Sequence, residues 1–113
     1  MKITIIQSRT FAKTIDKLLG KKQLLQEDFD DLKKTLAEKP TTGDLIPGTG
    51  GIRKIRLKSP SKGKSGGFRV CYFDDQKDSN LYLLLIYPKS SQQSLTPAEK
   101  KILKETTKII KGN

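Results

Sequence analysis

Residues 50–58 read Gly-Gly-Ile-Arg-Lys-Ile-Arg-Leu-Lys, and residues 66–73 read Gly-Gly-Phe-Arg-Val-Cys-Tyr-Phe. In the first run cationic side chains alternate with apolar ones, which is the period of a half-buried β-strand. The alternation places Lys54, Arg56 and Lys58 on one face of a sheet, about 6.6 Å apart, while the apolar residues between them face a core. The two runs therefore predict a pair of strands that present a row of cations.

The region around these two runs is rich in basic residues and contains no acidic ones. Between residues 48 and 73 there is no acidic residue, and the basic ones are Arg53, Lys54, Arg56, Lys58, Lys62, Lys64 and Arg69. Cations fixed on a sheet can hold adjacent phosphates of a nucleic acid, or hold one phosphate and stabilise charge that develops on it. The formal charge of the whole chain, +11, also exceeds what solubility requires. A polyanionic partner is expected, and nucleic acid is favoured over an acidic protein.

The elements expected along the chain follow from its hydrophobic periodicity and its turn residues. They are a strand over residues 2–7, a helix from about residue 8 to Gly20, a second helix ending at Lys39-Pro40, strands at about 52–58, 66–74 and 80–87, and a helix opening at Thr96. The order β-α-α-β-β-β-α predicts an α+β fold in one domain, residues 1–113. We expect the first two helices to form a hairpin, and all helices to pack on one face of a mostly antiparallel sheet.

The composition excludes several classes of chemistry. There is no histidine, and the single cysteine, Cys71, lies in an apolar run and is expected to be a small core residue in a reducing cytosol. The acids are scattered singly, so neither a metal site nor a cofactor is expected. No apolar run is long enough to span a membrane, and the first helix is too polar for a signal peptide, so a cytoplasmic protein is predicted.

A site built from lysine and arginine can still cleave RNA, because the 2′-hydroxyl supplies the nucleophile. Arginines would neutralise the phosphorane, and a lysine crowded among them has its pKa lowered toward the range of a general base. Lys54 and Lys58 are the candidates for that base. Tyr87, at the end of a neighbouring strand, is a candidate for stacking on a base or for donating a proton. From these residues alone, a sheet that binds nucleic acid without cutting it is equally well supported.

Three segments carry a resemblance to a known family. The entry Gly-Thr-Gly-Gly-Ile-Arg-Lys-Ile-Arg, the run that begins at Gly66, and the run Leu83-Leu-Leu-Ile-Tyr-Pro-Lys89 resemble the RelE superfamily of bacterial toxins, most closely its HigB-like branch. The resemblance implies a RelE-like fold and a type II toxin–antitoxin toxin that enters the 30S A site of the ribosome and cleaves mRNA during translation. It also implies a cognate antitoxin, HigA-like and DNA-binding, through which alone the toxin reaches operator DNA.

The resemblance assigns roles to four positions of this chain. Lys54 and Arg56 match the family's pair of basic residues on the strand that faces the message. Arg69 matches the arginine that contacts the scissile phosphate. Lys89 falls in the basic segment after the last strand, although Ser90 stands where the family often has an arginine.

The general acid and base are not assigned by the resemblance. Around Leu95 and Thr96, where some members carry a catalytic tyrosine, this chain has none. The expected catalytic set is therefore Lys54, Arg56, Lys58, Arg69 and Tyr87, and the expected RNA-binding set is Arg53, Lys62, Lys64 and Lys89. Two alternatives are a ParE-like gyrase poison, whose relatives generally lack the concentrated basic strands, and a non-catalytic nucleic-acid-binding module.

Overall fold

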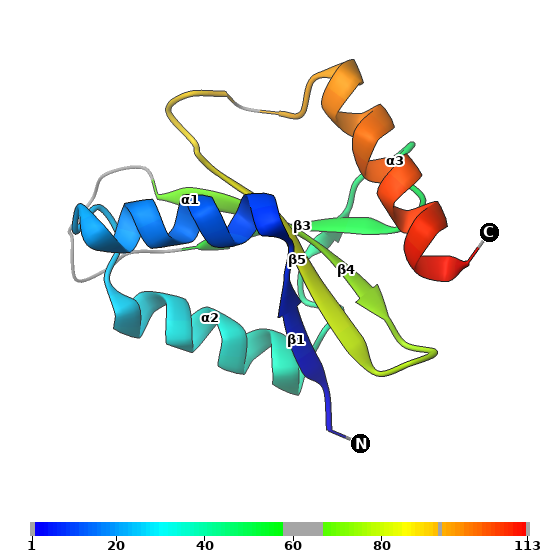
Figure 1. Ribbon diagram of the computed structural model, residues 1–113, viewed down its shortest axis with the longest axis horizontal. Helices are drawn as coiled ribbons and strands as arrows, with labels where there is room; N and C mark the ends of the chain where they lie inside the picture. Colours follow the sequence, from blue (N-terminus) through cyan, green and yellow to red (C-terminus); the bar gives the residue numbers. More distant parts are fainter. Residues whose placement is uncertain (1, 58–66, 93, 113) are drawn as a thin grey trace.

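The computed structural model describes residues 2–57, 67–92 and 94–112, and these residues form three helices and a five-stranded sheet (Figure 1). In chain order the elements are β1 Thr4–Gln7, α1 Arg9–Gly20, α2 Gln26–Glu38, β2 Asp44–Leu45, β3 Ile52–Leu57, β4 Phe68–Asp75, β5 Asn80–Pro88 and α3 Pro97–Lys111. Lys58, Lys62 and Lys64, which are expected in the site from the sequence, lie outside the described residues.

The sheet has the strand order β1-β5-β4-β3-β2. The edge strand β1 runs parallel to β5, and the other neighbours are antiparallel. The predicted mostly antiparallel α+β architecture is therefore confirmed. The short strand β2 was not expected, because two residues, Asp44 and Leu45, are too few to show alternation, and they form a strand only through their pairing with Lys54 and Arg53.

The predicted helical hairpin covers one face of the sheet. The apolar stripes of α1 and α2, which include Phe11, Ile15 and Leu36, are buried against Val70 of β4 and Leu83 of β5. Ser8 begins α1 as its N-cap, since its Oγ accepts a hydrogen bond from the backbone N–H of Phe11. The cluster of buried apolar side chains on this face is the larger of the two clusters in the structure.

Helix α3 packs on the opposite face, so the expectation that all helices share one face is wrong. Its Leu103 joins a second cluster with Ile52, Cys71 and Leu84. The reason is that β4 and β5 carry apolar side chains on both faces of the sheet. The face away from the hairpin must therefore also be covered, and α3 covers it. Figure 1 shows α3 standing apart from the α1–α2 pair. Arg56 points to the side of the sheet on which α3 lies and is exposed, so α3 leaves that part of the face open.

Candidate nucleic-acid site

Three side chains stand in one row across the sheet on the face that α3 covers in part. The register pairs Arg56 of β3 with Arg69 of β4, and Arg69 with Tyr87 of β5. Their neighbours along the strands face the hairpin, because Leu57 and Val70 belong to the hairpin cluster. We call Arg56, Arg69 and Tyr87 the basic row.

The two arginines of the basic row are held next to each other without an acid between them. Directly paired residues of antiparallel strands have Cβ atoms about 4.5–5.5 Å apart, and like charges at such positions destabilise the sheet. The Nη1 atom of Arg69 is buried and has no hydrogen-bond partner among the residues described. A fixed, buried donor of this kind is unfavourable until an anion accepts from it. The pair is therefore suited to hold a phosphate.

Tyr87 supplies a second buried donor in the same row. Only 6% of the residue is exposed, and its hydroxyl likewise makes no hydrogen bond within the described parts of the chain. Burial is the main cause of its raised pKa; Cys71 and Glu99 raise the pKa further, and Arg69 opposes them. The phenol therefore stays protonated at neutral pH and can donate a hydrogen bond or a proton.

Lys54 lies on β3, two residues before Arg56 of the basic row. It faces the same side of the sheet as Arg56 and is paired with Asp44 of β2 and Cys71 of β4. Burial raises the pKa of the Cys71 thiol to about 12. The thiol is therefore protonated and unreactive, which agrees with its predicted role as a core residue.

Of the two described residues that were expected to bind RNA, Lys89 lies near the basic row and Arg53 does not. Lys89 is exposed and follows β5 directly, and its backbone N–H donates to the carbonyl of Gly67 (3.1 Å), which places it at the end of the sheet that carries the basic row. Arg53 lies apart from the row: its Nη1 donates to the carbonyls of Gly43 (2.7 Å) and Thr41 (3.3 Å). The structure thus brings together Lys54, Arg56, Arg69, Tyr87 and Lys89, but not Arg53.

Glu99, in the first turn of α3, lies near the row and was not expected to belong to the site. Its Oε1 accepts from Gln92 Nε2 (2.9 Å) and from the backbone N–H of Thr96 (2.9 Å). The hydrogen bond from Thr96 is the main cause of its lowered pKa, so the carboxylate is ionised. Thr96 and Glu99 form a capping box, a pattern that marks the start of α3 in the sequence, but no local signal shows that Glu99 comes close to Tyr87.

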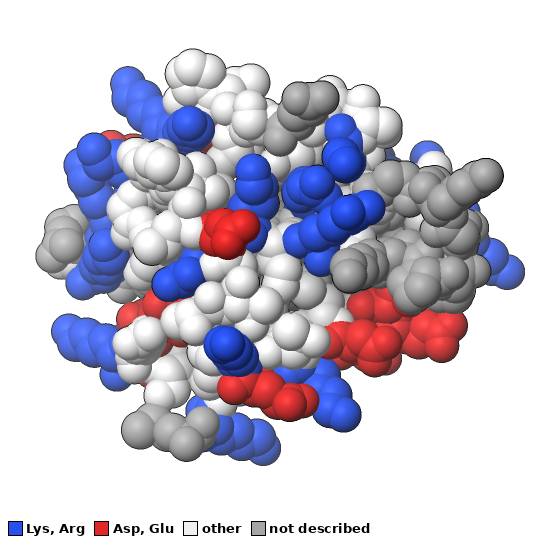
Figure 2. Space-filling model, turned by 180° about the vertical axis from the view of Figure 1, so that it is seen from behind, with Lys and Arg blue, Asp and Glu red and all other residues white. Residues whose placement is uncertain are grey.

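The charge of the surface is uneven. Figure 2 shows Lys and Arg side chains gathered near the centre of the face seen from behind, with smaller patches of acidic surface beside and below them. Within the described part of the chain, no group of three or more His, Cys, Asp or Glu side chains is placed to hold a metal ion. Nor does any described helix have the length and apolar character needed to cross a membrane.

Comparison with known proteins gives a family and a fold. The family model described as the RelE toxin of the RelE/RelB toxin–antitoxin system matches residues 3–112. Among solved structures, a mutant of the E. coli toxin RelE in the free state superposes with a TM-score of 0.54 at 15% sequence identity, covering 82% of this chain and 90% of that one. At this identity the structural likeness supports the fold, and the family match rests on the sequence.

Proposed function

Because the chain belongs to the family of RelE toxins of toxin–antitoxin systems, we propose that it is a metal-independent endoribonuclease that cleaves mRNA on the translating ribosome. The observation that supports the proposal most is the basic row: two directly paired arginines, one with a buried unpartnered Nη1, beside a protonated and unpartnered tyrosine hydroxyl. Structural arginines are normally paired with acids or carbonyls, as Arg53 is.

The row suggests how the reaction proceeds. The 2′-oxygen of the RNA attacks the adjacent phosphorus, the bond from phosphorus to the 5′-oxygen breaks, and a 2′,3′-cyclic phosphate and a 5′-hydroxyl result. Arg56 and Arg69 would hold the non-bridging oxygens and stabilise the charge of the phosphorane. Lys54 is the described candidate for the base that takes the 2′-proton. Tyr87 is the candidate for the donor to the departing 5′-oxygen.

The proposed partners follow from the family and the charge. The 30S A site of the ribosome and its mRNA are polyanionic and would attract a protein of formal charge +11. The toxin–antitoxin family implies an antitoxin. We place the chain in the HigB-like branch, with a HigA-like, DNA-binding antitoxin and a cytoplasmic site of action, on the three sequence segments that carry the resemblance.

A reconstituted translation reaction tests the proposal. Purified protein is added, and the 5′ ends of the message are mapped by primer extension. We expect new ends on translated message only, and a loss of cleavage of about 10²-fold or more in Arg69→Ala, because one donor to the developing charge is removed. Lys13→Ala removes the same charge from an exposed position of α1 and should cut normally.

Intact message in the presence of the wild-type protein would contradict the nuclease. In that case supercoiling by DNA gyrase is the next assay, since a gyrase poison would act there without cleaving RNA. Protein that binds RNA and leaves both messages and gyrase unaffected would be a binding module.

A further inference from the structure

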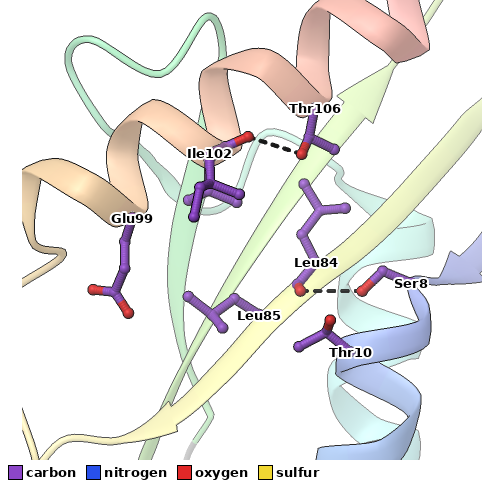
Figure 3. Close-up of a pocket in the computed structure, with 8 residues that line it drawn as sticks. Ser8, Thr10, Leu84, Leu85, Glu99, Ile102 and Thr106 are labelled. Carbon is purple, nitrogen blue, oxygen red and sulfur yellow. Dashed lines mark hydrogen bonds between the residues drawn. The ribbon is translucent and has the colours of Figure 1, made fainter.

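A groove of about 350 Å³ lies between the start of α1, strand β5 and helix α3 (Figure 3). Leu84 and Leu85 of β5 form its floor, and Ile102 lines the α3 side. Ile102 is 65% exposed, which is high for a large apolar residue. Figure 3 shows Glu99 at the end of the groove toward which β5 runs. The groove is therefore a mainly apolar slot with a carboxylate at one end.

The polar lining of the groove consists of the Glu99 carboxylate and the hydroxyls of Ser8, Thr10 and Thr106. The hydroxyls of Ser8 and Thr106 donate their protons to the carbonyls of Leu84 (3.1 Å) and Ile102 (2.9 Å), and Ser8 Oγ also accepts from the Phe11 N–H, whereas the Thr10 hydroxyl can donate or accept. At Glu99, Oε1 accepts two hydrogen bonds, and the Thr96 side chain also helps to lower the pKa of the carboxyl. A ligand with flat apolar faces, and with N–H donors on the edge that meets Glu99, fits this slot.

The position of the groove relates it to the basic row. Leu85 precedes Tyr87 by two residues on the same strand, a distance of about 6.6–6.8 Å. The carboxylate of Glu99 is close enough to Tyr87 to contribute to that residue's raised pKa. A phosphate held at the row would thus place its own nucleoside beside the mouth of the groove. The unpartnered Arg69 Nη1 and Tyr87 hydroxyl are a separate indication that a ligand binds at the basic row, next to the groove.

We propose that the groove is a base-reading subsite: it receives the nucleobase that adjoins the phosphate held by Arg56 and Arg69, and Glu99 selects bases with an N–H edge. Guanine presents an imino and an amino donor side by side and is preferred. Adenine and cytosine present an amino group, whereas uracil presents one imino group between two carbonyl oxygens that the carboxylate repels. This inference rests on the proposed RNA-directed function and adds a specificity to it.

Binding of short RNA analogues tests the subsite without cleavage. Tetranucleotides with 2′-deoxy sugars, differing at one base, are titrated into ¹⁵N-labelled protein. We expect guanine to bind at least about tenfold more tightly than uracil, with shifts of the Leu85 and Ile102 amides. Glu99→Gln should abolish this preference, because the amide keeps an oxygen for the Thr96 cap but replaces the charged acceptor. The control is Glu105→Gln, which removes an acid of α3 that pairs with Lys108 (3.7 Å) and is not part of the groove.

Several results would overturn the subsite: equal affinity for all four bases, no binding, or shifts at Arg69 that leave the amides of the groove unmoved. If the antitoxin alone moves those amides, the groove is a protein-docking surface instead. Mapping message cleavage with the same variants separates the two proposals. If Glu99→Gln cleaves with unchanged base preference, the nuclease proposal holds and the subsite proposal is wrong. If the protein binds guanine selectively but cleaves no message, the subsite proposal holds and the nuclease proposal is wrong.

Discussion

At the scale of single residues, the basic row reduces stability unless it has a ligand. Arg56 and Arg69 repel each other at directly paired positions, and Arg69 and Tyr87 bury donors that find no acceptor among the described residues. A chain selected for stability alone would place apolar residues or acids there. Groups held in this way are typical of binding and catalytic sites, where the ligand supplies the missing partner.

Tyr87→Phe separates the chemistry of this hydroxyl from its packing. The ring stays and a buried, unpartnered donor is removed, so the free energy of unfolding should stay constant or rise by up to about 1 kcal/mol. Cleavage should fall about 10²-fold if the hydroxyl protonates the leaving oxygen. Chemical denaturation and primer extension on the same preparation measure the two effects.

Tyr72→Phe is the matched control for that substitution. The Tyr72 hydroxyl accepts from the Gly43 N–H (2.8 Å) and donates to the carbonyl of Pro40 (2.7 Å), so its loss should cost about 1–3 kcal/mol of stability and leave cleavage by the folded protein intact. A Tyr87→Phe protein that is less stable but fully active would show that this tyrosine has a structural role only.

At the scale of elements, the sequence predicts what is local and misses what depends on packing. The alternation in residues 52–57 predicts correctly that Ile55 and Leu57 face a core, because side-chain direction in a strand has a fixed period of two. The capping box at Thr96 predicts the start of α3 and is present in full. The face on which α3 packs has no such signal, since both faces of β4 and β5 are apolar.

The same distinction explains how much of the candidate site could be predicted. Arg56 and Arg69 can be identified from the alternation and the family resemblance, because each lies in a distinctive strand. Arg53 lies in the same run, yet its guanidinium binds the carbonyl of Gly43, a contact between segments ten residues apart. Glu99 reaches the site only because α3 packs back on the sheet against β3 and β4, and this packing is a property of the tertiary structure.

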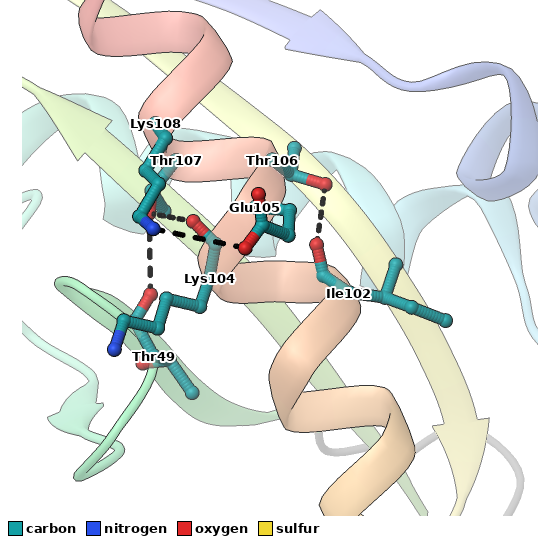
Figure 4. Close-up of polar contacts among 7 residues, drawn as sticks. All are labelled: Thr49, Ile102, Lys104, Glu105, Thr106, Thr107 and Lys108. Atoms are coloured by element: carbon teal, nitrogen blue, oxygen red, sulfur yellow. Dashed lines mark hydrogen bonds and ion pairs between the residues drawn. The ribbon is translucent and has the colours of Figure 1, made fainter. Parts of the chain in front are cut away.

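Helix α3 contacts the turn before β3, and substitutions of two glycines in that turn, Gly48 and Gly50, can test this contact. Figure 4 shows Thr107 of α3 beside Thr49, and Thr107 Oγ1 lies 3.3 Å from the carbonyl of Thr49. A Cβ at Gly50 would lie 2.6 Å from that Oγ1, whereas a Cβ at Gly48 would meet nothing within 4 Å. Both glycines have a positive φ, +78° and +79° respectively.

Gly48→Ala should therefore cost only the left-handed backbone conformation, about 1–2 kcal/mol, while Gly50→Ala should cost about 1–3 kcal/mol more because it pushes α3 away. Thermal unfolding of both variants gives the difference. The double substitution of Gly50→Ala with Thr107→Ala should be less destabilising than the sum of the two single changes. If both glycine variants lose the same stability, α3 can shift away from residue 50 without an energetic penalty, and the predicted clash would be wrong.

At the scale of the whole molecule, the excess charge bears on association with a partner. A formal charge of +11 on 113 residues repels itself, and the ion pairs among the described residues are surface pairs within helices, such as Lys33–Asp30 at 3.5 Å. Such exposed pairs contribute little to stability. The charge is therefore better explained by a polyanionic partner, to which it brings long-range attraction and faster encounter.

The salt dependence of RNA or ribosome binding tests this explanation and the basic row together. Each phosphate contact releases condensed counterions, so the logarithm of the affinity should fall linearly with the logarithm of the salt concentration, with a slope of about 0.7 per contact on single-stranded RNA. Arg69→Ala should reduce the slope by about one contact, and Lys13→Ala, an equal loss of charge on exposed α1, should leave it nearly unchanged. Tyr87→Phe should weaken binding at every salt concentration without changing the slope, because it removes no charge. An unchanged slope in Arg69→Ala would mean that its guanidinium does not contact a phosphate, and the proposed role of the row would then be wrong whatever the overall affinity.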